Sequence, residues 1–341
     1  MPWVTDDGKP NIANPALAVV IATKNRSEAM GKYALPSLER SSFRDFVCVV
    51  WDASDDTATR EVAQGRPWNF EIAYFKAPRV GSSSQRNDGV RHVLENYPSV
   101  GAIVFMDDDS ELSEDALGGV VSSFRESCAA IVNIRMKPLA LPSWRGRVAQ
   151  CLKRFLGMNR HGATPFLYNY GGDDEEAGID AEWAGGGGMG VDVSLFAGRG
   201  IFFPEEFQRF GGYALGEDFA FSFFVFKKGY GRIVNSEQGY FLHYAAGGFR
   251  LDVKNMAASK WYNFHLLFDA VYDDVRGPKL WCLKAQFKLF MCAAALKLLI
   301  RARSFDICAV LRGIEAARAA LKEYRRDKRH LMKTPFHESA K

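Results

Sequence analysis

The 341-residue sequence lacks the closely spaced cysteine pairs of a zinc ribbon or a disulfide-stapled protein. Its six cysteines are scattered, which favours a reducing compartment. They are Cys48, Cys128, Cys151, Cys282, Cys292 and Cys308. The N-terminal segment has no basic stretch followed by an apolar core, so no signal peptide is expected. No uncharged run reaches the roughly 18–20 residues of a membrane-spanning helix. These absences predict a cytoplasmic protein without disulfides.

The composition is that of an ordinary globular protein. Charged residues make up 25% and apolar residues 48%, which excludes a disordered chain or a fibrous repeat. At roughly 100–200 residues per domain, the length allows one large domain or two modest ones. The net charge of +4 conceals an asymmetry, because residues 279–341 carry 15 Lys and Arg against 5 Asp and Glu. A basic tail on an acidic body suggests that the tail meets something anionic.

Apolar runs alternate with segments of helical periodicity in the first part of the chain. Strands are predicted at 17–22, 46–51, 71–75, 102–106 and 130–134, and helices at 27–40, 57–65, 82–97 and 113–127. This alternation predicts an α/β fold with a mostly parallel sheet covered by helices on both faces. The second part predicts a helix at 217–228, short strands at 231–235 and 239–243, and helices from 255 to the end.

Polar clusters follow three of the predicted strands. Residues 23–26 are Thr-Lys-Asn-Arg, residues 52–56 contain three aspartates, and Asp107, Asp108 and Asp109 directly follow a buried strand. Ligands of such sheets bind beyond the carboxyl ends of the strands. Three consecutive carboxylates repel one another, and Mg²⁺ or Mn²⁺ would relieve the repulsion and bridge to a substrate diphosphate. The alternative is a solvated acidic turn that caps the next helix.

In the order of its motifs, the sequence resembles the family 2 glycosyltransferases of the GT-A fold over about residues 16–245. The matching segments are VVIATKNR (19–26), VVWDASDD (49–56), GSSSQRNDG (81–89), FMDDDSEL (105–112), WAGGGGMGVDVSLF (183–196), GEDFAFSFFVFKKGYGRIV (216–234) and FLHY (241–244). Two departures, Ala22 for proline and Gln85 for alanine, fall at positions that are not expected to carry chemistry.

The resemblance implies two regions. Residues 1–250 would form the GT-A catalytic domain, with a donor half at about 16–134 and an acceptor half at about 135–250. Residues 251–341 would form a basic helical C-terminal region. The loop at 135–182 and the part after 250 match no motif and should hold the acceptor specificity.

The resemblance also implies a nucleotide-sugar donor and the residues that bind it. Those residues would be Thr23, Asn25, Arg26, Asp52, Arg86, Asn87, Asp107 and Asp108. Asp52 would accept a hydrogen bond from the base, although a helix-capping role is the alternative. Arg86 and Asn87 would border the donor at a helix start, where phosphate is favoured. Arg86 could instead form a surface salt bridge.

Metal, base and acceptor residues are implied in the same way. Asp109 and His243 would ligate Mg²⁺ or Mn²⁺, and Asp218, with Glu217 beside it, would be the general base of an inverting transfer. His243 could simply end a strand, and the two acids could simply occupy a first helical turn. Trp183, Gly186 and Gly187 would line the acceptor side, although Trp183 is equally well explained as a core residue.

Two basic segments raise the question of a membrane contact. Residues 279–303 and 144–156 combine lysine and arginine with apolar and aromatic residues, a pattern typical of helices that lie on an anionic membrane. A helix packed on the catalytic domain with solvated lysines is the alternative. Nucleic-acid binding is not expected, because few aromatic residues interleave with the basic ones.

The sequence thus predicts an inverting, metal-dependent glycosyltransferase. It would move a single sugar from a UDP- or dTDP-sugar to a hydroxyl of a lipid-linked glycan. This transfer would take place during the assembly of a cell-surface polysaccharide or glycoconjugate. The chain lacks the Q-x-x-R-W motif of processive synthases. The alternatives are a nucleotidyltransferase on a related fold and a non-catalytic module that binds glycan or nucleotide. A Rossmann dehydrogenase is disfavoured, because the G-x-G-x-x-G match at 185–190 does not follow a predicted strand.

Overall fold

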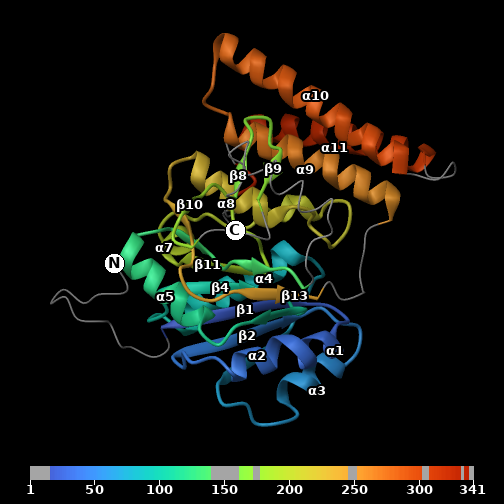
Figure 1. The fold of residues 1–341 in the computed structure, drawn as a ribbon. Helices are drawn as coiled ribbons and strands as arrows, with labels where there is room; N and C mark the ends of the chain where they lie inside the picture. The colour runs from blue at the N-terminus through green and yellow to red at the C-terminus, as the bar shows by residue number, and fades with distance from the viewer. Residues whose placement is uncertain are drawn as a thin grey trace.

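A computed structural model describes residues 16–139, 161–171, 177–244, 252–301, 307–331 and 334–337. An eight-stranded sheet forms its centre, in the order β10-β12-β6-β11-β4-β1-β2-β3 (Figure 1). The strands are β1 (Leu17–Thr23), β2 (Phe46–Asp52), β3 (Glu71–Lys76), β4 (Ala102–Met106), β6 (Ile131–Asn133), β10 (Asp180–Ala181), β11 (Gly188–Asp192) and β12 (Ile233–Asn235). Strands β4, β1, β2 and β3 run parallel, which confirms the α/β class and the mostly parallel sheet.

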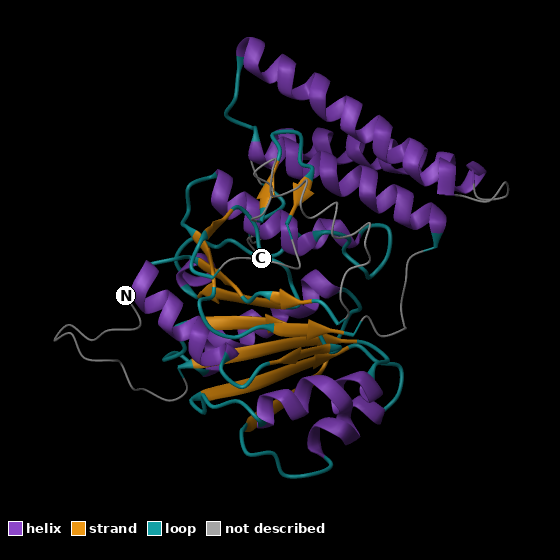
Figure 2. Ribbon diagram, in the orientation of Figure 1, coloured by secondary structure: helices purple, strands orange, loops and turns teal. Residues whose placement is uncertain are grey.

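Alternate residues of the central strands feed two apolar cores, one on each face of the sheet. In β1, Leu17, Val19 and Ile21 enter one core, whereas Ala18 and Val20 enter the other. The first core is covered by α1 (Ser27–Ala29), η1 (Met30–Ala34), α2 (Leu35–Glu39), α3 (Ala58–Gln64) and α5 (Ala116–Ser127). The second is covered by α4 (Ser82–Asn96), α7 (Ser194–Ala197), η2 (Glu205–Gln208), α8 (Glu217–Lys227) and α9 (Val253–Val271). Because successive side chains of a strand point to opposite faces, the sheet buries apolar residues on both faces. The result is a three-layer arrangement, and Figure 2 shows the helices on both sides of the strands.

The helix predicted at 27–40 is interrupted by a π-helical turn. In η1 the backbone N–H of Leu35 donates to the carbonyl of Met30, five residues earlier. Pro36 follows directly and has no N–H to donate to the preceding turn. The wider π-helical turn lies where the hydrogen bond of Pro36 is missing, between η1 and α2. The helix therefore continues through a π-bulge instead of ending.

Two strands of the central sheet, the two-residue β10 and the longer β11, are absent from the predictions. Strand β11 lies antiparallel between β4 and β6 and begins within the glycine run. Glycine is poor in strands, so its sequence carries little strand signal. The glycine at 190 is needed for close packing, because a Cβ there would lie 2.7 Å from Cγ1 of Val120 on α5.

Two small sheets complete the domain. β5 (Ser110–Leu112), β13 (Phe241–His243) and β7 (Met136–Lys137) form one, and β8 (Gly162–Ala163) pairs with β9 (Asn169–Tyr170). In the first sheet, β13 runs antiparallel to β5 with His243 opposite Ser110. This pairing brings a late segment of the chain to the end of β4.

Three helices form the C-terminal region: α9, α10 (Gly277–Arg301) and α11 (Ile307–Leu331). Buried residues of all three, among them Tyr262, Phe287 and Leu321, join the core that α4 and α8 cover. The division into domains at residue 250 stays a prediction. Among the described residues, no helix is long and apolar enough to cross a membrane. The basic segment 144–156 lies outside the described residues.

Candidate active site

A cavity of about 520 Å³ opens at the carboxyl ends of β1 and β4. Ten residues predicted for the site line it: Thr23, Arg26, Arg86, Asp107, Asp108, Asp109, Gly186, Glu217, Asp218 and His243. They come from six separate segments of the chain, which the parallel strand ends and the pairing of β13 with β5 bring to one edge of the sheet. The volume is in the usual range for a small-molecule site, about 300–1,000 Å³.

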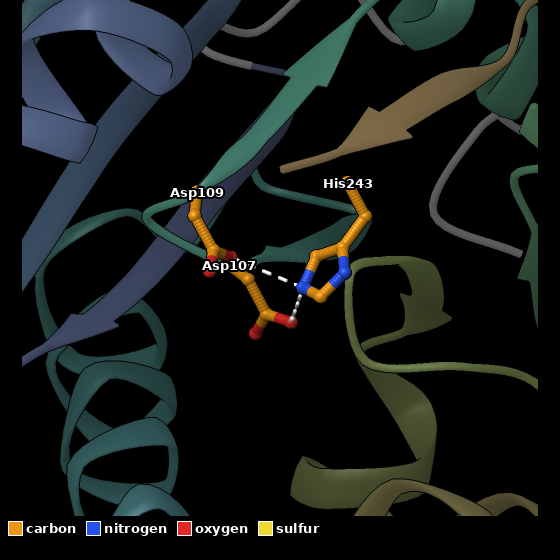
Figure 3. A group of neighbouring side chains, drawn as sticks. All are labelled: Asp107, Asp109 and His243. Atoms are coloured by element: carbon orange, nitrogen blue, oxygen red, sulfur yellow. Dashed lines mark ion pairs between the residues drawn. The ribbon is translucent and has the colours of Figure 1, made fainter. Parts of the chain in front are cut away.

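Asp107, Asp109 and His243 form a cluster on one wall of this cavity (Figure 3). Nε2 of His243 lies 3.1 Å from Oδ1 of Asp109 and 3.9 Å from Oδ2 of Asp107. The backbone N–H of Tyr244 donates to the carbonyl of Asp109 at 3.0 Å and fixes the end of β13 against the turn after β4. The hydrogen bond with Asp109 and the nearby Asp107 charge raise the pKa of His243, against the effect of its partial burial. Potential ligand atoms of the three residues all lie within 4.8 Å of one another, so they are close enough to hold one divalent cation.

Part of the repulsion within the acidic triplet is relieved by a cation of the chain itself. Nη1 of Arg26 lies 3.0 Å from Oδ1 of Asp108 and 3.1 Å from Oδ2 of Asp109. Asp108 is buried and also accepts a hydrogen bond from Oγ1 of Thr23 at 2.7 Å. Burial raises the pKa of Asp108 to about 6 even though Arg26 opposes the shift. Asp108 therefore holds Thr23 and Arg26 in place, while the other two carboxylates of the triplet approach His243.

Arg86 joins the two halves of the site. Its guanidinium is buried on α4, and Nη2 donates to Oδ1 of Asp107 at 2.9 Å while Nη1 donates to Oε1 of Glu217 at 2.6 Å. Burial raises the pKa of Glu217 to about 7, since the cost of desolvating its charge exceeds the stabilisation by Arg86. The surface salt bridge considered for Arg86 is thus replaced by a buried one that connects the end of β4 with the start of α8.

Asp218 faces the cavity from the first turn of α8. Its Oδ2 accepts from the backbone N–H of Gly186 at 2.9 Å, and its Oδ1 accepts from that of Phe219 at 2.7 Å. Gly216 precedes the helix with a φ of 78°, a left-handed conformation that glycine adopts readily and that aims the first turn at the cavity. Two backbone donors therefore fix the orientation of the carboxylate.

Two residues that were predicted to lie near the nucleotide base of the donor form hydrogen bonds within the protein instead. Asp52 is fully buried, and its oxygens accept from the N–H of Ser54 at 2.8 Å and from the hydroxyl of Tyr74 at 2.7 Å. Asn25, at a φ of 54°, bonds with its side chain to Asp55. Neither lines the cavity. In this structure both residues hold together the loops after β1 and β2.

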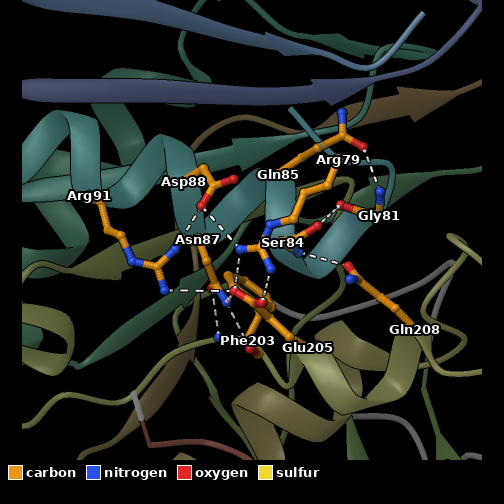
Figure 4. A network of polar contacts seen from close by, with 10 residues as sticks. All are labelled: Arg79, Gly81, Ser84, Gln85, Asn87, Asp88, Arg91, Phe203, Glu205 and Gln208. Carbon is orange, nitrogen blue, oxygen red and sulfur yellow. Dashed lines mark hydrogen bonds and ion pairs between the residues drawn. The ribbon is translucent and has the colours of Figure 1, made fainter. Parts of the chain in front are cut away.

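Asn87 does not line the cavity and lies instead in a polar network with Phe203 and Glu205 (Figure 4). Its Nδ2 donates to the carbonyl of Phe203 at 2.9 Å and its Oδ1 accepts from the N–H of the same residue at 3.0 Å. Nδ2 also lies 3.1 Å from Oε1 of Glu205. Adjacent residues of a helix point in different directions, so Arg86 enters the cavity while Asn87 anchors the segment before η2.

Trp183 and Gly187, predicted on the acceptor side, are also outside the cavity lining. The Trp183 ring stacks on His161 at 4.0 Å, and its Nε1 donates to the carbonyls of Gly162 and Tyr170. A Cβ at position 187 would lie 2.7 Å from the Phe241 ring. The surroundings of Trp183 therefore fit the alternative that it is a core residue. Gly187 leaves space for Phe241, so that β13 can approach β11.

Gln85, Tyr213 and Met256 are among the lining residues that were not predicted for the site. Gln85 donates through Nε2 to the carbonyl of Thr23 at 2.9 Å and to that of Trp51 at 2.7 Å, so it ties the ends of β1 and β2 together. Tyr213 and Met256 enter from the segment before α8 and from α9. Burial and nearby carboxylates, Glu217 first among them, raise the pKa of Tyr213 to about 12. No sequence signal marked the last two, because they come from unpatterned segments.

The chain matches a family model in sequence and solved structures in fold. Residues 18–169 match the family model described as glycosyl transferase family 2. No curated protein sequence matches the chain. Structural similarity was found to TarS of S. aureus, at a TM-score of 0.50 and 17% identity, covering 80% of this chain and 42% of TarS. The chain therefore spans less than half of that TarS chain.

Two structures with bound ligands are also similar in fold. The fragment 1–349 of S. aureus TarS in complex with UDP has a TM-score of 0.51 at 17% identity, covering 80% of this chain and 70% of the fragment. The mannosyltransferase PcManGT of Pyrobaculum calidifontis, in complex with GDP-Man and Mn²⁺, has a TM-score of 0.53 at 16% identity, covering 92% of this chain and 83% of PcManGT. At these identities the similarity shows the fold alone. Together with the helices α9, α10 and α11, it confirms the expected GT-A core with a C-terminal helical extension. Residues 18–169 are thus similar to the family 2 glycosyltransferases, and the chain has a GT-A fold.

Proposed function

We propose that the chain moves a single sugar from a UDP- or dTDP-sugar to a hydroxyl of a glycan, with inversion at the anomeric carbon. The observation that carries the proposal is that the Asp107–Asp109–His243 cluster and the Asp218 carboxylate line one cavity. Direct displacement needs both a site for the leaving diphosphate and a base for the acceptor hydroxyl.

The donor class is supported by ligands of similar structures. The TarS fragment holds UDP, and PcManGT holds GDP-Man with Mn²⁺. The choice of a uracil or thymine base follows from the sequence resemblance. We further propose a lipid-linked acceptor, a place in cell-surface polysaccharide or glycoconjugate assembly, and work in the cytoplasm at the membrane.

The residues of the cluster fit Mg²⁺ or Mn²⁺. Two carboxylates offer hard oxygen ligands, and an imidazole is a nitrogen ligand that Mn²⁺ also accepts. Asp107, Asp109 and His243 would hold the ion, and a bound ion neutralises the charge that builds on the departing diphosphate. Arg26 and Arg86 set the charge and position of Asp109 and Asp107.

Asp218 is the proposed general base. Its carboxylate would accept the proton of the acceptor hydroxyl while that oxygen bonds to the anomeric carbon and the bond from this carbon to the diphosphate oxygen breaks. The N–H groups of Gly186 and Phe219 hold the two carboxylate oxygens in a fixed orientation and leave a lone pair on each oxygen. Glu217 is the weaker candidate, because its charge is already paired with Arg86.

Nucleotide release tests this proposal directly. UDP-, dTDP- and GDP-sugars would be incubated with the full chain in Mn²⁺ or in EDTA, and the released nucleoside diphosphate measured. We expect slow, metal-dependent release from one UDP- or dTDP-sugar. Binding of a nucleotide without any release would instead support a non-catalytic module. Absence of both release and thermal stabilisation with every donor would refute the donor site.

Alanine at position 186 should lower the transfer rate about 10- to 100-fold. A Cβ there would lie 2.9 Å from Nη2 of Arg86, the atom that binds Asp107, and 3.3 Å from Cβ of Asp218. Displacing catalytic groups by a fraction of an ångström costs rates of about this size. The matched control is Gly185→Ala, whose Cβ meets no atom within 4 Å. Equal rates for Gly185→Ala and Gly186→Ala would contradict the role of this contact.

The rate should fall as the pH drops through about 7, where Glu217 becomes protonated. Protonation removes the carboxylate charge that pairs with Arg86 and so weakens the contact through which Arg86 connects Asp107 with the start of α8. In Glu217→Gln the rate should stay low across this range, without the inflection. The pH profile of kcat at saturating donor measures the effect. An unchanged inflection in Glu217→Gln would assign the titration to another group.

A further inference from the structure

Helix α10 has two apolar faces. One packs inward, with Leu283, Phe287 and Met291 buried in the core. The other carries four large apolar side chains that are exposed to solvent: Trp281 (78%), Leu289 (72%), Leu296 (57%) and Ile300 (74%). Their spacing of eight, seven and four residues places them along one side of the helix. We call this set the outer stripe.

The outer stripe lies at the edge of the molecule. Figure 1 shows α10 as the outermost helix, on the side of α9 and α11 away from the central sheet. Single exposed apolar residues are common, but an aligned set of this size on one helix marks an interaction surface. The two alternatives weighed for the segment 279–303 are therefore compatible, because the inner face packs on the protein while the outer stripe stays available.

The charges around the stripe are of one sign. Helix α10 contains no Asp or Glu, and its lysines Lys279, Lys284, Lys288 and Lys297 are all exposed. In the part of the chain that the structure describes, none of the four pairs with a carboxylate within 4.0 Å. Lys297 also lies near Lys260 of α9, whose pKa is lowered by burial and by that neighbouring charge. An anionic surface would reduce this repulsion.

We propose that the outer face of α10 docks on the surface of an anionic lipid bilayer. The apolar side chains of the stripe enter the boundary between headgroups and acyl chains, and the lysines bind headgroup phosphates. A tryptophan at one end of the stripe suits this boundary, because an indole is apolar with one polar tip. Association of two copies through this face would oppose lysines with lysines, so the charge favours the bilayer.

The proposal stands independently of the transfer reaction, but it would bring the site close to a lipid-linked acceptor. Helix α9 packs against both α10 and α11. Met256, in its first turn, lines the cavity. A docked α10 would thus be joined to the cavity by a packed helix.

Co-sedimentation with vesicles tests the proposal on the full chain. The probes are vesicles of phosphatidylcholine alone and of phosphatidylcholine with 30% phosphatidylglycerol. We expect clear binding to the anionic vesicles and at least tenfold weaker binding to the neutral ones, with a strong decrease at high salt. Equal binding to both, or binding to neither, would overturn the proposal.

Two variants separate the two contributions. Lys284→Gln with Lys288→Gln should weaken binding to anionic vesicles about 30-fold, at about 1 kcal/mol for each lysine. Leu289→Gln with Leu296→Gln should weaken it at least about tenfold by removing apolar contact. All four positions are exposed, so the thermal unfolding temperature should not change.

Matched controls come from other surfaces of the protein. Leu139→Gln changes a leucine that is 53% exposed, close to the 57% of Leu296, and Lys32→Gln with Lys227→Gln removes two exposed lysines of other helices. These variants should bind vesicles like the wild type. Binding loss equal to that of the α10 variants would overturn the assignment to α10. A wild-type dimer that Leu289→Gln with Leu296→Gln converts to a monomer would show that a second copy covers the stripe instead.

Discussion

Changing Asp109 to asparagine should lower the rate of nucleotide release from the donor about 10³-fold at fixed Mn²⁺. Its carboxylate lies 3.1 Å from Nε2 of His243, inside the cluster proposed to hold the ion. Asparagine keeps the shape but removes one negative charge, and metal stabilisation of a leaving group is worth several kcal/mol. Release kinetics over a range of Mn²⁺ concentrations measure the effect, and excess Mn²⁺ should restore part of the rate.

Asp192→Asn is the matched control for that change. Asp192 pairs with Ala102 at the start of β4, at the opposite end of the strand from the acidic triplet, and lies outside the cavity. Its replacement should leave release and its Mn²⁺ dependence unchanged. If Asp109→Asn and Asp192→Asn have the same rates, Asp109 does not belong to a metal-dependent donor site.

Replacement of Asp218 by asparagine should also lower transfer about 10³-fold, but with a different signature. A general base contributes about 10²- to 10⁴-fold, and asparagine cannot accept the proton. Donor and Mn²⁺ binding should stay near wild type, because Asp218 lies on the α8 wall and away from the cluster contacts. Kinetics measured with saturating donor, together with a donor titration, separate the two effects.

Glu217 provides the comparison that identifies the base. It is adjacent to Asp218 but is buried and paired with Arg86 at 2.6 Å. Glu217→Gln should retain more activity than Asp218→Asn above pH 7, since only the charge balance of Arg86 is disturbed. A variant Asp218→Asn with more than a tenth of wild-type kcat would rule out Asp218 as the base.

The parallel half of the sheet could be predicted from local patterns. Buried strands such as β1, β2 and β4 are continuous apolar runs, and polar residues follow each directly. Parallel pairing then brings those strand ends together, which is why the cavity holds Asp107 and Arg26 as expected. Strand β11 was not predicted, because its glycines serve packing contacts made by distant elements and carry no strand pattern.

Side-chain direction explains most of the remaining differences at the site. Asp52 and Asn87 lie in matching motifs, yet neither lines the cavity, and they bind Tyr74 and Phe203, which are distant in sequence. The pairing of Arg26 with the acidic triplet likewise depends on tertiary placement. A motif can name the segment that forms a site, but the partners available in the fold decide which of its side chains face the substrate.

The central claim is that the Asp107–Asp109–His243 cluster and the cavity form one metal-dependent nucleotide site. The most direct test is a Mn²⁺ titration of the full chain with and without UDP or dTDP, in which electron paramagnetic resonance measures Mn²⁺ binding. If the metal and the nucleotide bind in contact with each other, each must raise the binding affinity of the other by the same factor. We predict that one of these nucleotides tightens Mn²⁺ binding at least tenfold, and that His243→Gln reduces this gain. The same Mn²⁺ affinity with and without every nucleoside diphosphate would contradict the claim.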